Sequence, residues 1–133
     1  MNIPTFTIDN IKDKDFLYKE IEEESLRIFN RAGNKDQTLD EIKKNTSMGK
    51  IAECFLIEYF GYKKADKEYH DVMNNDGEYI EVKAYSYGNI FNDFIIRDLN
   101  RYKYATWNHS TWYILFNCVN GVYYHQATIK LKD

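Results

Sequence analysis

Hydrophobic and polar residues alternate most regularly in the segment 68–85. In its second half Ile80, Val82 and Ala84 would share one face of a strand, and the polar and aromatic residues between them would share the other. The preceding run Asn74-Asn75-Asp76-Gly77 is typical of a tight turn between two strands. The segment therefore predicts a β-hairpin.

The length of the hairpin loop decides which side chains share a face. In a three-residue loop, Asn75-Asp76-Gly77, the glycine takes the left-handed position and Asp71 lies opposite Glu81, with Cβ atoms about 5 Å apart. Lys83 then follows on the same face, roughly 7 Å further along the strand. A two-residue loop, Asp76-Gly77, would place Asp71 on the other face. The functional interpretation therefore depends on the longer loop.

Helical periodicity marks the segment 13–31. Its apolar positions form a stripe on one side of the predicted helix: Leu17, Ile21, Ile28 and Phe29. Four glutamates would line the solvent side: Glu20, Glu22, Glu23 and Glu24. We expect nucleic acid to avoid this acidic side.

Two further helices are indicated by their capping residues. Thr38 with Glu41 forms a capping box for a short helix that ends near Lys44. Thr46 or Ser47 would cap a second helix over 48–60, which Gly61 ends.

The rest of the chain supplies one more helix and further strands. We expect an edge strand within 62–67, a helix over 93–105, a buried apolar strand over 111–117, and a returning strand over 122–130 after the turn Asn120-Gly121. The order predicts one α/β domain, residues 1–133, with a mixed sheet that ends in one extra C-terminal hairpin strand.

The amino-acid composition argues against several classes of protein. The chain has 133 residues, 44% of them hydrophobic, and a net charge of −3, which argues against a general polyanion binder. Cys54 and Cys118 both lie in apolar runs and are expected to be buried thiols. No apolar run is long enough to span a membrane, and the first residues do not resemble a signal peptide, so we expect a cytoplasmic protein without membrane contact.

The hairpin carries the candidate chemistry. Two adjacent carboxylates, Asp71 and Glu81, need a compensating charge, and their oxygens suit a hard divalent cation such as Mg²⁺. A lysine beside them, Lys83, can hold a water molecule or neutralise charge that develops on a phosphoryl oxygen.

Asp71 followed by Glu81-Val82-Lys83 on the next strand resembles the motif of the PD-(D/E)XK nuclease superfamily, with His70 in place of its proline. The order of elements over about 47–118 is similar to the restriction-endonuclease-like core, and this resemblance implies an α/β fold with a central four-stranded mixed sheet flanked by helices. The resemblance implies a DNA endonuclease that uses Mg²⁺, or Mn²⁺ in its place. Asp71, Glu81 and the Val82 carbonyl would bind the metal, Lys83 would act on the attacking water, and Glu53 would supply an additional acidic residue.

Five basic residues near the hairpin are the expected contacts for DNA phosphates: Lys63, Lys64, Lys67, Arg97 and Arg101. Because one subunit of this size carries one site, cutting two strands would need a homodimer. Two other readings stay open. One is a catalytically silent nucleic-acid-binding or regulatory protein with the same fold, and the other is an interaction protein without nucleic acid, which the negative net charge favours.

Overall fold

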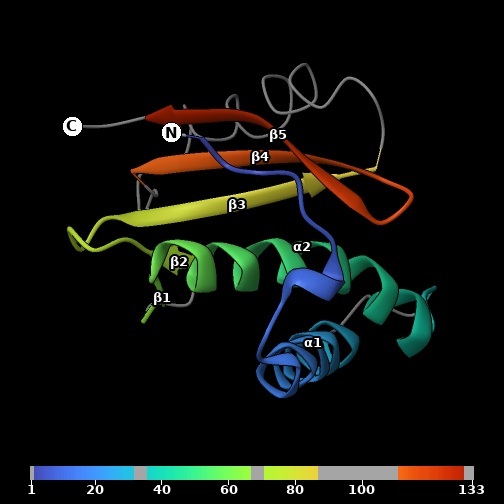
Figure 1. The fold of residues 1–133 in the computed structure, drawn as a ribbon. Helices are drawn as coiled ribbons and strands as arrows, with labels where there is room; N and C mark the ends of the chain where they lie inside the picture. The colour runs from blue at the N-terminus through green and yellow to red at the C-terminus, as the bar shows by residue number, and fades with distance from the viewer. Residues whose placement is uncertain (1, 32–35, 67–70, 87–110, 131–133) are drawn as a thin grey trace.

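The computed structural model describes residues 2–31, 36–66, 71–86 and 111–130. Within these ranges the chain forms two α-helices and a five-stranded mixed sheet whose strands lie in sequence order (Figure 1). The strands are β1 (Lys63–Lys64), β2 (Val72–Met73), β3 (Tyr79–Tyr85), β4 (Trp112–Val119) and β5 (Val122–Lys130). Only β3 and β4 are parallel, and the other neighbours are antiparallel. The predicted α/β class with a mixed sheet is thus confirmed.

The hairpin between β2 and β3 has the longer of the two predicted loops. Asn74 N–H donates to Glu78 O at 2.9 Å, and Gly77 N–H donates to Asn74 O at 3.1 Å. Gly77 has a φ of 78°, in the left-handed region where a side chain would be strained. Val72 is paired with Ile80, so the register follows the three-residue loop.

The second hairpin, β4 and β5, matches its prediction closely. Asn120 and Gly121 both have positive φ, at 51° and 80°, as a two-residue turn of type I′ requires. In β4 three consecutive side chains, Ile114, Leu115 and Phe116, are fully buried. Consecutive side chains point to opposite faces, so this strand is covered on both sides.

Helix α2 (Leu39–Phe60) is a single helix, and the prediction of two separate helices is wrong. Thr38 caps its start by accepting from Glu41 N–H at 3.2 Å, and Gly61 follows its end with φ 69°. Between them Asn45-Thr46-Ser47 stays helical, and the Ser47 hydroxyl donates to Lys43 O one turn back. Buried residues on both sides of this stretch, such as Ile42 and Ala52, hold the helix together across it.

Helix α1 (Lys14–Phe29) begins at Asp13, whose carboxylate accepts from Phe16 N–H at 3.0 Å. Leu17 and Ile21 are buried as expected, whereas Phe29 is exposed. Glu20 is buried too, so its placement on the solvent side was wrong. Glu20 lies within the same turns as Leu17 and Ile21 and is paired with lysines from two other elements.

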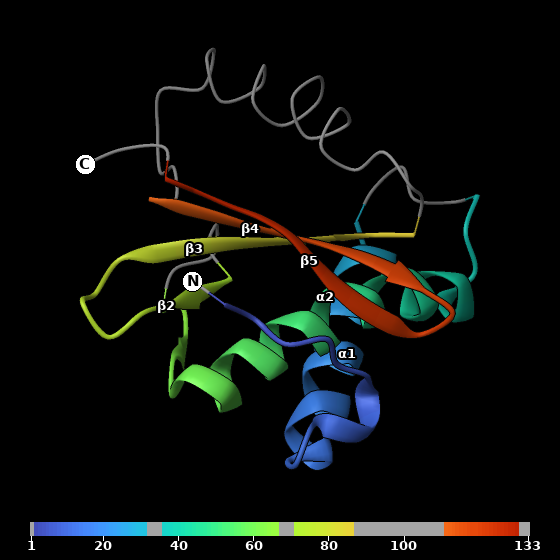
Figure 2. The same cartoon turned by 45° about the horizontal axis from the view of Figure 1, so that its top comes forward.

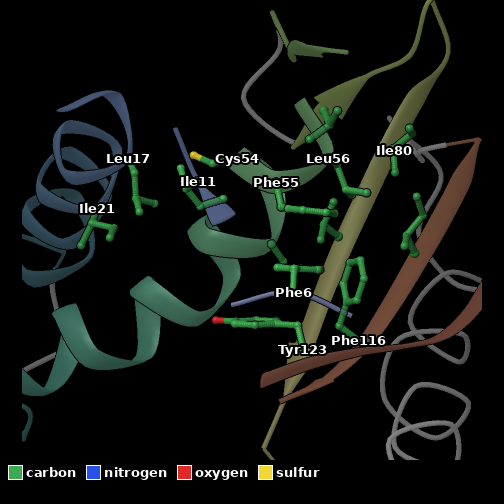
Figure 3. Close-up of a cluster of buried hydrophobic side chains, with 14 residues drawn as sticks. Phe6, Ile11, Leu17, Ile21, Cys54, Phe55, Leu56, Ile80, Phe116 and Tyr123 are labelled. Atoms are coloured by element: carbon green, nitrogen blue, oxygen red, sulfur yellow. The ribbon is translucent and has the colours of Figure 1, made fainter. Parts of the chain in front are cut away.

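Both helices lie on the same side of the sheet, with α2 next to the strands and α1 packed beneath α2 (Figure 2). The core fills the space between α2 and the sheet (Figure 3). At its centre the Phe6 ring stacks between Phe55, at 3.9 Å, and Tyr123, at 4.8 Å. Phe6 also pairs with Tyr123 through two backbone hydrogen bonds, so the N-terminal segment is part of the folded unit.

Three of the predicted DNA contacts, Lys67, Arg97 and Arg101, and the predicted helix over 93–105 lie outside the described residues. Among the described residues, no helix is both long enough and apolar enough to cross a membrane.

Candidate functional site

The site lies just before the start of β2, where the edge of β3 has no neighbouring strand among the described residues. Asp71, the residue before β2, donates its N–H to Ile80 O at 3.3 Å. Its carboxylate oxygen Oδ2 accepts from Val82 N–H at 2.9 Å. Asp71 therefore bonds to the residues on either side of Glu81, which places the two acids next to each other, as the predicted register requires.

Glu81 and Lys83 extend from β3 on the face opposite Ile80 and Val82, which are buried in the core. The Lys83 ammonium lies 3.6 Å from Glu81 Oε1. Both side chains are partly exposed, at 32% for Lys83 and 20% for Glu81. The three residues predicted from the hairpin therefore meet at one place.

Helix α2 brings a third carboxylate to this place. Glu53 is buried beside the core residues Ala52 and Cys54, and its Oε1 accepts from the Lys50 ammonium at 3.3 Å. Lys50 lies one turn earlier on the same helix, and its side chain is only 15% exposed. The Asp71 carboxylate is close enough to both Glu53 and Glu81 to act on the protonation of each.

Burial of the three acids disfavours full ionisation of the cluster. Burial, followed by the charge of Asp71, raises the pKa of Glu53 from 4.5 to about 8. The same two causes in the same order raise the pKa of Glu81 from 4.5 to about 8. Burial also raises the pKa of Asp71, against hydrogen bonds from Val82 N–H and from Glu81. The hydrogen bond between Glu81 and Asp71 raises the pKa of Glu81 and opposes the rise in the pKa of Asp71, which favours the proton on Glu81.

A cavity of about 630 Å³ opens beside Asp71 and Glu53. Its walls come from α1, from α2 and from the segment 64–66. Glu20 stands in this wall and pairs with Lys64 at 2.8 Å and with Lys50 at 4.0 Å. Burial disfavours the charge on Lys50, but the surrounding acids, with Glu53 and Glu20 first among them, together more than offset it and raise the lysine pKa.

The predicted DNA contacts Lys63 and Lys64 are both exposed on β1. Lys64 is held by Glu20 of the acidic helix, so acidic and basic surfaces adjoin instead of lying on separate sides. The expected separation of the two charges is therefore wrong at this point.

The residues fit a magnesium ion that keeps much of its water. In the part of the chain that the structure describes, no three side chains of His, Cys, Asp or Glu are placed to hold one metal ion together. Mg²⁺ is usually held by one or two carboxylates, with water and substrate phosphate completing its shell. Asp71 and Glu81 supply such a pair, and the pKa of Glu81, which burial and the charge of Asp71 raise, marks a site with an excess of negative charge. The Val82 carbonyl faces the same open edge as the Val82 N–H, because both groups of one strand residue point to one neighbour.

Two residues of the cluster were not predicted. Lys50 could have been found from the i,i+3 spacing to Glu53 on a helix. Glu20 carries no such signal, because its partners come from distant parts of the chain. No protein-family model matches the sequence, and no curated protein matches it either.

Proposed function

We propose that this protein is a Mg²⁺-dependent DNA endonuclease of the PD-(D/E)XK type. The observation that carries the proposal is the meeting of Asp71, Glu81 and Lys83 at the open edge of β3. A solvated strand has no need to pair two carboxylates, because like charges at adjacent positions destabilise a sheet. The buried third acid beside them, Glu53, adds to that cost and is understandable if a cation or a phosphate is bound there.

The fold supports the same proposal. A mixed sheet with an antiparallel β2–β3 hairpin and a parallel β3–β4 pair, with a helix packed before it in sequence, is what a restriction-endonuclease-like core would contain. Under this proposal α2 is the helix that carries the additional acid, Glu53.

Each residue has a role that follows from its place. Asp71 and Glu81, with the Val82 carbonyl, would hold the cation. When bound, Mg²⁺ supplies positive charge to the scissile phosphate and lowers the pKa of a coordinated water. Lys83 would orient the attacking water or neutralise the charge that grows on the phosphoryl oxygens. Glu53 would hold a further water or a second cation.

DNA would approach over Lys63 and Lys64, together with the other basic residues expected near the hairpin: Lys67, Arg97 and Arg101. Two copies of the chain would be needed to cut both strands of a duplex, so a homodimer belongs to the proposal. Each lysine that contacts a duplex phosphate should contribute about 0.9 to the slope of log K against log salt.

The test is incubation with supercoiled plasmid, linear duplex, single strand and a four-way junction, in Mg²⁺, Mn²⁺ or EDTA. We expect cleavage of at least one substrate in either cation and none in EDTA. Glu81→Gln should abolish the cleavage. Asp76→Asn, which removes a carboxylate from the exposed loop of the same hairpin, should not.

Binding of DNA without cleavage in any cation would favour the catalytically silent alternative. Neither binding nor cleavage would reject both. A thermal shift adds an independent check, because a cation that binds only the folded state must raise the melting temperature relative to EDTA.

A further inference from the structure

Lys50 is paired with Glu53 at the buried end of the carboxylate cluster. Its ammonium donates to Glu53 Oε1 at 3.3 Å, and its side chain is 15% exposed. Lys83 pairs with Glu81 at the opposite, more exposed end. The cluster therefore has one lysine at each end, and only Lys83 belongs to the motif on which the proposed function rests.

Lys50 is itself held from a second element. Glu20 of α1 is buried, and its Oε1 lies 4.0 Å from the Lys50 ammonium, while its Oε2 takes the Lys64 ammonium at 2.8 Å. A long flexible side chain that contacts acids on two helices loses most of its rotamers. This arrangement fixes the ammonium where Glu53 needs a donor.

The hydrogen bond to Lys50 also selects one orientation of Glu53. Oε1 is occupied by the ammonium, and Oε2 is turned toward Gly49. A Cβ atom at position 49 would lie 3.9 Å from Oε2, an ordinary contact. The bond to Lys50 thus engages Oε1 and orients the whole Glu53 carboxylate.

We propose that Lys50, anchored by Glu20, is a positioning residue that holds the Glu53 carboxylate in place beside Asp71 for the proposed cleavage. Lys50 acts through Glu53 and has no separate contact with DNA in this proposal. The inference deepens the proposed function and rests on it. Residues that orient the groups around a metal or a reacting phosphate typically contribute about 10-fold to 100-fold to activity.

The experiment compares Lys50→Met and Lys50→Arg with Lys43→Met. Lys43 is the matched control because it also extends from α2 to an acid of α1, Glu22, at 3.0 Å, but lies outside the carboxylate cluster. We expect Lys50→Met to lower the single-turnover cleavage rate by about 10-fold or more while DNA binding in Ca²⁺ is kept. Lys50→Arg should restore most of the rate, and Lys43→Met should leave it unchanged.

A double-mutant cycle with Glu53→Gln separates positioning from direct contact. If Lys50 acts through Glu53, Lys50→Met should cause no further loss of rate in the Glu53→Gln protein. In the absence of metal, Lys50→Met should lower the urea midpoint clearly in the parent and much less in Glu53→Gln, because only the parent leaves a buried carboxylate without its donor.

The outcomes distinguish this inference from the proposed function. An active parent with an unaffected Lys50→Met variant, or additive losses in the cycle, would overturn the positioning role and leave the nuclease proposal intact. A parent that cleaves nothing in any cation would reject the proposed function, and the role of Lys50 with it. In that case a coupled urea midpoint would show only a structural ion pair.

Discussion

The β2–β3 hairpin and the β4–β5 hairpin differ in how far their strands stay paired. The β4–β5 hairpin continues from the turn at Asn120-Gly121 to the pair Trp112–Lys130, interrupted only by an irregularity near Leu115 and Phe116. The β2–β3 hairpin stops after two residue pairs, although β3 itself continues to Tyr85. Backbone pairing is thus nearly complete in one hairpin and cut short in the other.

The early end of the β2–β3 pairing leaves room for polar side chains at the edge of β3. Where the pairing with β2 stops, the Val82 N–H of β3 donates to the Asp71 carboxylate and not to a backbone carbonyl. Replacing a ladder bond by a side chain leaves the strand edge satisfied but open. We infer that the long hairpin mainly forms the core, whereas the short one carries the functional side chains. Substitutions in each hairpin test this difference.

The largest expected effect is that of Glu81→Ala in the short hairpin. Cleavage should be abolished, because half of the proposed carboxylate pair is removed. Folding should persist, because Glu81 lies on the face opposite the core and its removal leaves no core cavity. Plasmid cleavage and circular dichroism measure the two effects. Unchanged cleavage would remove Glu81 from the proposed site.

Lys83→Met should lower the cleavage rate by about 100-fold or more, the size expected when a group that stabilises transition-state charge is lost. The methionine keeps the length of the side chain, so DNA binding in Ca²⁺ should change by only a few-fold. Single-turnover rates and binding titrations check this. Equal losses in rate and affinity would make Lys83 a simple phosphate contact.

The stability of the metal-free protein should fall as the pH rises from about 4.5 to about 8. Burial and Asp71 raise the pKa of Glu53 and Glu81 to about 8, so the folded state keeps protons that the unfolded state has already released. Urea unfolding in EDTA across this range measures the slope. Glu81→Gln should flatten it, and a flat profile in the parent would contradict the raised pKa values.

Asp71→Ala should lower the free energy of unfolding by about 1–3 kcal/mol, because the Val82 N–H loses its acceptor at a partly buried edge. Asp71→Asn keeps an oxygen acceptor there and should preserve most of the stability while it still abolishes cleavage. Urea unfolding of the two variants at one pH compares them. Equal stabilities would show that the carboxylate does not complete the edge of β3.

The smallest expected effect lies in the turn of the long hairpin. Gly121→Ala places a side chain at φ 80° and should cost about 1–2 kcal/mol of stability. The cleavage rate per folded molecule should not change, because this turn lies at the far end of β4 from the carboxylates. A selective loss of rate would mean that the two hairpins are not independent.

Much of this arrangement could be predicted from the sequence because both hairpins are specified locally. Gly77 and Asn120-Gly121 set the two registers, and the register alone brings Asp71, Glu81 and Lys83 together. Such signals work because a turn residue with positive φ and a period of two leave few alternative pairings.

The failures concern groups that depend on distant partners. Thr46 and Ser47 have the side chains of a helix cap, but packing at both ends of α2 outweighs their local preference. Glu20 looks like one more glutamate of an acidic helix, and only its contacts with Lys50 and Lys64 explain its burial. Periodicity within one segment contains no information about those partners.

The pairing of Phe6 with Tyr123 also has a consequence for synthesis on the ribosome. The contact joins a residue near the start of the chain to one near its end, and the Phe6 ring fills the centre of the core. Contacts between such distant positions form late and slow the folding of a domain. Because translation proceeds from the N-terminus, the Phe6 ring lacks its partner Tyr123 until β5 emerges. In the nascent chain the ring of Phe6 therefore stays partly uncovered longer than the contacts between α1 and α2, and transiently exposed apolar surface of this kind is what chaperones bind.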